Sequence, residues 1–123
     1  MKYPPVFQVV AADPAVTALI GANPVRFYLF GMAPDKPAGT YCVWQVINGS
    51  PENYLAGRPD VEAYGLQVDV FASTAAGARA AGQAIEYAIE LAARVTSYNG
   101  ETRDTETILY RYSFDDVDWI VQR

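Results

Sequence analysis

An alanine-rich segment, Ser73 to Arg94, constrains the fold of this chain more than any other stretch. Its apolar residues recur at helical spacing and form one stripe: Ala78, Ala81, Ile85, Ala88, Ile89 and Ala92. Ser73 or Thr74 can cap the start of the helix, because a hydroxyl at this position accepts a backbone N–H. Since the stripe is mostly alanine, the helix can approach a sheet closely. The segment therefore predicts one long helix packed on a β-sheet.

The stretches on either side of this helix have the pattern of β-strands. Residues 25–30 and 40–47 are apolar runs rich in aromatic and β-branched side chains. Residues 61–72 alternate, and the apolar residues of one face are Tyr64, Leu66, Val68 and Val70. These three runs predict three strands.

Local signals mark the remaining elements. Asp13 and Pro14 are a typical cap and first residue of a short helix, which Gly21 would end. Asn99-Gly100 predicts the turn of a hairpin. In the last strand the apolar pattern changes phase at Asp115-Asp116, where a bulge would keep both apolar sets inward.

Together these segments predict an α+β fold in a single domain that spans residues 1–123. We expect a mainly antiparallel sheet of about four to five strands, with the long helix and the N-terminal helical segment packed on one face. The other face would leave aromatic side chains uncovered in a monomer, from among Tyr28, Phe30, Trp44 and Phe71. Uncovered patches of this kind usually mark contact with another chain, so we expect an oligomer.

Composition argues against the common kinds of catalytic and metal site. The chain has no histidine, which removes Ser-His-Asp and Cys-His catalysis and the usual zinc sites. The only cysteine, Cys42, sits in an apolar run, where cysteine is usually a small buried hydrophobe. The acidic run Asp115–Asp118 is better explained by a bulge than by a cation site. We therefore predict a protein that is not an enzyme, with no catalytic residue, cofactor or bound metal.

The charge pattern also argues against nucleic-acid binding. The chain carries 14 acidic and 9 basic residues, for a net charge of −5, and its basic residues form no stripe. No stretch approaches the ~18 apolar residues that a membrane helix needs.

The segment SPENYLAGRPD, residues 50–60, is interpreted as a loop that joins two strands and contacts other chains. Its carboxylates, with Glu62 beside them, could form an acid/base pair, but a loop rich in proline and glycine would leave them hydrated. Charged residues and tyrosine at strand ends are typical of contact surfaces, and the predicted turn from Asn99 to Arg103 shares this character. The expected interface residues are Glu52, Asn53, Tyr54, Leu55, Arg58, Asp60, Asn99 and Arg103.

Three stretches resemble the tail-completion or tail-to-head joining (tail terminator) proteins of tailed phages. They are FQVVAADPAVTALIG with RFYLFGMAP, then YCVWQVINGSPENYLAGRPDVEAYGLQVDVFAST, then VTSYNGETRDTETILYRYSFDDVDWI. Together they cover essentially the whole chain in the right order, and the middle stretch is the most specific. Where the family commonly has valine or a similar residue, this chain has Cys42.

The resemblance implies a structural protein of a tailed phage or prophage, made in the bacterial cytoplasm and located in the virion at the head-proximal end of the tail. It implies a ring-shaped homo-oligomer, expected to be a hexamer, that ends tail polymerisation and joins tail to head. The implied partners are other copies, the tail tube protein and a head-side neck protein. DNA would pass through the ring without specific binding, and no membrane would be involved.

Two other functions stay open at this point. No feature of the sequence excludes another head–tail neck protein, a connector or stopper on the head side of the joint. A small ligand-binding or catalytic α+β domain would use its sheet face as a pocket, and the missing histidine and scattered carboxylates count against it. A ring predicts a large closed oligomer, whereas the ligand-binding or catalytic alternative predicts a monomer or dimer.

Overall fold

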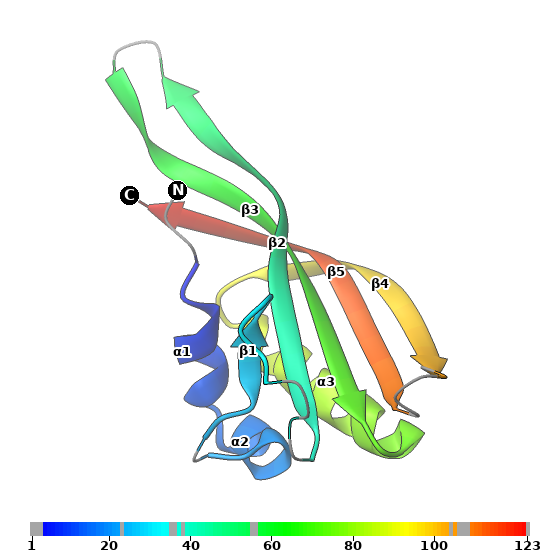
Figure 1. The fold of residues 1–123 in the computed structure, drawn as a ribbon. Helices are drawn as coiled ribbons and strands as arrows, with labels where there is room; N and C mark the ends of the chain where they lie inside the picture. Colours follow the sequence, from blue (N-terminus) through cyan, green and yellow to red (C-terminus); the bar gives the residue numbers. More distant parts are fainter. Residues whose placement is uncertain are drawn as a thin grey trace.

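The computed structural model of the chain describes residues 4–22, 24–34, 37, 39–54, 57–103, 105 and 109–122, with backbone only for 48–54, 57–63, 96–97, 115–118 and 120–122. In chain order the elements are α1 (Val6–Ala11), α2 (Pro14–Ile20), β1 (Phe27–Leu29), β2 (Tyr41–Tyr54), β3 (Gly57–Ala72), α3 (Ala75–Ile89), β4 (Arg94–Arg103) and β5 (Tyr110–Gln122). The strands form one sheet in the order β1-β2-β3-β5-β4. β1 and β2 are parallel, and every other neighbouring pair is antiparallel. The helices cover one face of this sheet (Figure 1), which confirms the predicted α+β fold.

The long helix forms as predicted, but it is shorter. Thr74 caps α3, since its Oγ1 accepts the Gly77 N–H at 3.0 Å. Five of the six predicted stripe residues are buried, whereas Ala92 lies beyond the helix and is exposed. The helix ends at Ile89, where the hydrogen-bond pattern changes. The Leu91 and Ala92 N–H groups bond to carbonyls three residues back, instead of the four residues of an α-helix.

α3 lies close to β5 at Gly82. A Cβ atom at this position would be 2.1 Å from Cδ1 of Tyr112, a separation that van der Waals contact does not allow. The predicted close approach of the helix to the sheet therefore depends on glycine here, as well as on the alanine stripe.

The N-terminal segment forms two short helices, α1 and α2. The Asp13 carboxylate accepts the Ala15 N–H at 2.9 Å, and Pro14 is the first residue of α2, as predicted. Gly21 ends α2 with a φ of +91°, a conformation that L side chains rarely adopt. The buried residues of the two helices are Val6, Val10, Val16 and Ile20.

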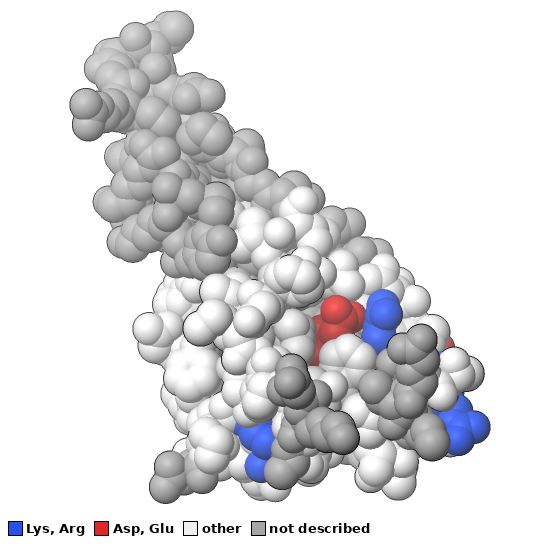
Figure 2. Space-filling model, in the orientation of Figure 1, with Lys and Arg blue, Asp and Glu red and all other residues white. Residues whose placement is uncertain are grey.

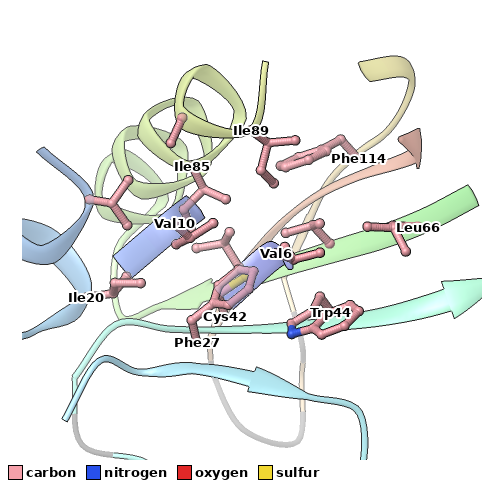
Figure 3. Packing of buried hydrophobic residues seen from close by; sticks show 14 of the residues in the cluster. Val6, Val10, Ile20, Phe27, Cys42, Trp44, Leu66, Ile85, Ile89 and Phe114 are labelled. Atoms are coloured by element: carbon pink, nitrogen blue, oxygen red, sulfur yellow. The ribbon is translucent and has the colours of Figure 1, made fainter. Parts of the chain in front are cut away.

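The core lies between the helices and the sheet (Figure 3), and it includes the whole predicted face of β3, from Tyr64 to Val70. Trp44 also belongs to it: only 6% of this residue is exposed, and its ring lies 6.5 Å from that of Phe27. The expectation that Trp44 is uncovered is therefore wrong, because the even-numbered residues of β2 face the helices. Phe30 is 67% exposed, as expected, while Tyr28 and Phe71 are half-buried.

Cys42 is fully buried in this core. Loss of hydration raises the pKa of its thiol well above the ordinary value, and the nearby charge of Asp69 acts in the same direction. The thiol stays protonated at neutral pH, so Cys42 behaves as the small buried hydrophobe that its sequence context predicts.

A bulge in β5 confirms the predicted phase change. Leu66 pairs with Val117 and Val68 pairs with Phe114, so one residue of β3 lies opposite two of β5, Asp115 and Asp116. The extra residue reverses the alternation of inward and outward side chains. Phe114 and Trp119 consequently are both buried, although one number is even and the other odd.

The predicted hairpin turn at Asn99-Gly100 is wrong, because these residues lie inside β4. Tyr98 pairs with Phe114 and Gly100 pairs with Ser113, which leaves Asn99 as the extra residue of a second bulge. Gly100 has a φ of +95°, and a bulge uses such a residue as readily as a hairpin turn does. The Asn-Gly pair therefore correctly indicates the positive φ of Gly100, but this residue lies in a β-bulge and not in a hairpin turn.

The predicted loop at residues 50–60 is also wrong, since β2 and β3 continue through it as a hairpin. Backbone pairing runs from Ser50 with Ala63 to Tyr54 with Gly57. β1 pairs with β2 only as far as Trp44, so beyond that residue β2 has a described neighbour on one side only. Proline lacks a backbone N–H, and a sheet edge of this kind tolerates it. We call residues 48–54 and 57–63 the arm; it projects beyond the helices (Figure 1).

Candidate interaction surfaces

The structure separates the predicted interface residues into two groups. Glu52, Asn53 and Tyr54 at the end of β2 lie near Arg58 and Asp60 at the start of β3, because the arm is an antiparallel hairpin. Their side chains, and the whole of Leu55, lie outside the described residues. The other two predicted residues belong to β4, at the opposite edge of the sheet.

Those two residues, Asn99 and Arg103, are far from the arm. Arg103 pairs with Tyr110, which pairs with Ala72 at the other end of β3 from the arm. Its guanidinium lies 5.6 Å from the centre of the Tyr110 ring, and it borders a hollow of about 270 Å³ beside the first turns of α3. The Asn99 side chain donates a hydrogen bond to Ser113 Oγ at 3.1 Å, so it has a structural role in its bulge.

The face of the sheet without helices carries half-buried side chains that contact one another. Arg111 Nε lies 3.3 Å from Asp69 Oδ1, an ion pair without hydrogen-bond geometry, and Gln67 donates to the same carboxylate. The rings of Tyr41 and Phe71 stack with centres 5.1 Å apart. Figure 2 shows that the described surface on this side has few charged groups.

A second hollow, of about 350 Å³, opens on the helical side of the molecule. We call it the tyrosine–glutamate hollow; the residues that line it are Gln83, Glu86, Tyr87, Glu90, Tyr98 and Tyr112. The Glu86 carboxylate accepts hydrogen bonds from the hydroxyls of Tyr98 and, at 3.4 Å, of Tyr112. Three consecutive elements, α3, β4 and β5, thus meet at one carboxylate.

The sequence analysis did not identify this hollow. Helical periodicity alone places Glu86, Tyr87 and Glu90 off the apolar stripe of α3, which is a signal that they are accessible. The contribution of Tyr98 depends on the register of β4 against β5, which the bulge at Asn99 shifts by one residue. No pattern in the sequence predicts that register.

We expect Tyr98 to ionise at unusually high pH. The hydrogen bond to Glu86 is the main cause that raises the pKa of Tyr98 from 10.0 to about 12. Because the folded state holds this proton more tightly than the unfolded state, the stabilisation is present below pH 10.0 and is lost as pH rises through about 12. The difference in tyrosinate absorbance between wild type and Tyr98→Phe, followed through an alkaline titration, measures this pKa. A Tyr98 that titrates with the ordinary value would contradict the hydrogen bond to Glu86.

Neither a metal site nor a membrane-spanning helix is found among the described residues. Within them, no group of three or more cysteine, aspartate or glutamate residues could hold a metal ion. Nor does any helix in the described part of the chain have the length and apolar character needed to cross a membrane.

The described part of this α+β protein offers several surfaces for contact: the arm, the two hollows and the sheet face without helices. The family model for the tail completion protein gp17 matches residues 4–122. The match spans nearly the whole chain, so the protein belongs to this family and is a structural component of a phage-type virion tail. The resemblance noted in the sequence is thereby confirmed.

A solved structure supports the fold. A chain in the virion of a native gene transfer agent particle has 19% sequence identity and a TM-score of 0.67, and the match covers 96% of this chain and 92% of that one. At this level of identity the likeness concerns the fold alone. Comparison with curated proteins gives no match.

Proposed function

We propose that the protein forms a ring at the head-proximal end of the tail tube, where it ends polymerisation of the tube and joins tail to head. Membership of the tail completion family supports a role at the end of a tail. The arm is the observation that carries the proposal, because it extends away from the core that holds the subunit together (Figure 1).

An arm of this kind is suited to contact with a neighbour. Seven residues on each strand reach roughly 20 Å at the usual rise of a β-strand. Residues 61–63 of the arm pair with β5, but beyond Val61 the described arm has only two strands, and a two-stranded hairpin is only marginally stable by itself. Contact with another chain would stabilise the arm, as expected where subunits meet around a closed ring.

The proposed partners follow from this position. Copies of the chain would form the ring, for which we propose six subunits, with the tail tube protein on one side and a head-side neck protein on the other. The net charge of −5 disfavours adhesion to DNA that passes through the ring. The proposed role is one of docking and requires no catalysis.

Addition of the purified protein to growing tail tubes tests the proposal. We expect elongation to stop and electron microscopy to show a ring at one end of each tube, with a native mass that gives the number of copies. Empty heads without tails serve as the control. Binding to those heads, with no effect on tube growth, would indicate a head-side neck protein and contradict the proposal.

A further inference from the structure

Two carboxylates line the tyrosine–glutamate hollow, those of Glu86 and Glu90, and neither forms an ion pair with another described residue. The ion pairs between described residues are Arg79 with Glu101 and Arg111 with Asp69, and neither includes Glu86 or Glu90. Arg79 Nε lies 2.8 Å from Glu101 Oε1, so the Arg79 guanidinium is already paired with a carboxylate outside the hollow. Two carboxylates therefore remain available to a cation from outside.

The wall of the hollow is aromatic and open to solvent. Tyr87, which lines the hollow, is 74% exposed and is among the most exposed large hydrophobic side chains of the described residues. Tyr98 is 59% exposed, and its hydroxyl is held by Glu86. Exposed aromatic rings beside a fixed carboxylate offer a cation both a π-face and a charge partner.

The raised pKa values of two tyrosines in the hollow also indicate negative charge there. The charges of Glu86 and Glu90 add to the hydrogen bond in raising the pKa of Tyr98 to about 12. Desolvation and the Glu86 carboxylate also raise the pKa of Tyr112. Both shifts indicate a region that disfavours further negative charge.

We propose that the tyrosine–glutamate hollow binds an arginine-bearing segment of a different protein. A guanidinium can donate to the carboxylates while it stacks on a tyrosine ring, whereas an ammonium is a compact, strongly hydrated charge. The same chain already places the guanidinium of Arg103 5.6 Å from the ring centre of Tyr110.

Charge argues for a partner other than DNA or a second copy. DNA is a polyanion and would be repelled by the two carboxylates that line the hollow. A second copy carries a net charge of −5, so a basic protein segment complements the surface better. The inference does not depend on ring formation.

A peptide titration followed by two-dimensional amide NMR tests the inference. The probe is the end-blocked peptide Gly-Arg-Gly-Arg-Gly, with its lysine counterpart for comparison. We expect amide shifts in residues 83–90 and at Tyr98, and binding of the arginine peptide that is roughly threefold tighter than that of the lysine peptide. Equal affinities would remove the proposed role of the rings.

Three variants locate the binding. Glu86→Gln with Glu90→Gln should weaken binding roughly tenfold, since charge-assisted bonds become neutral. Glu52→Gln with Glu62→Gln makes the same change of charge in the arm and should leave the affinity within about twofold. Tyr87→Ala leaves the Glu86 hydrogen bonds in place and should weaken the arginine peptide selectively, which covers the case in which the glutamate variant fails to fold.

Two results would overturn the inference. If both glutamate pairs weakened binding equally, the attraction would be to the acidic chain as a whole. If the same amides broadened with protein concentration in the absence of peptide, the hollow would be the contact site of a second copy.

Discussion

The double variant Tyr54→Ala with Arg58→Ala is expected to lose tail joining while its subunit stays folded. Backbone pairing brings both positions to the outer end of the arm, beyond the residues of the core. Loss of a tyrosine and an arginine removes the two residue types that most often dominate contact energy, so we expect joined particles to fall at least about a hundredfold. The number of tailed particles in a complementation assay gives the result.

The control for this variant is Arg94→Ala, which removes an exposed arginine from β4, two strands away from β3 in the sheet. It should join tails as the wild type does. The urea midpoint should be the same for all three proteins, since Arg94 is exposed and the arm extends away from the described core. Normal tail joining by the arm variant would remove the assigned role of the arm.

Substitution Gly82→Val is expected to give the largest loss of stability. Its side chain would collide with the ring of Tyr112, whose Cδ1 atom lies 2.1 Å from the position of an added Cβ. Overpacking of this kind costs about 1–3 kcal/mol of unfolding free energy, because α3 must move away from β5. Urea denaturation measures the change.

Two further variants identify the cause of that loss. Ala80→Val adds the same side chain to an exposed position of α3 and should cost only about 0.7 kcal/mol, the difference in helix propensity. Tyr112→Ala combined with Gly82→Val should be more stable than the sum of the single effects predicts, by about 1 kcal/mol. Additive effects would show that Gly82 is not needed for the approach to Tyr112.

Much of the globular part was predictable because its signals are local or periodic. The stripe of α3, the alternation from Tyr64 to Val70 and the cap at Asp13 each depend on residues close in sequence. The bulge at Asp115-Asp116 was predictable for a related reason, since a change of phase in a strand has few physical solutions.

The arm and the tyrosine–glutamate hollow were harder to predict because they depend on how the strands pair in the sheet. Prolines such as Pro51 and Pro59 usually indicate a loop. Only the structure shows that β2 lies at a sheet edge there, because β1 ends at Leu29 and pairs with β2 no further than Trp44. Asn99-Gly100 usually indicates a turn, yet here it lies within a long strand. The hollow requires side chains from α3, β4 and β5, whose alignment depends on bulges in two strands.

The position of Pro51 on β2 has a consequence for solubility. An uncovered strand edge is a template on which further strands can add, and long uninterrupted edges lead to aggregation. Pro51 has no amide hydrogen to offer, and it lies where β2 has one described neighbour. The β2 edges of two subunits therefore cannot pair through a continuous series of backbone hydrogen bonds. Subunits that are not yet assembled are thus protected from fibril growth at this strand.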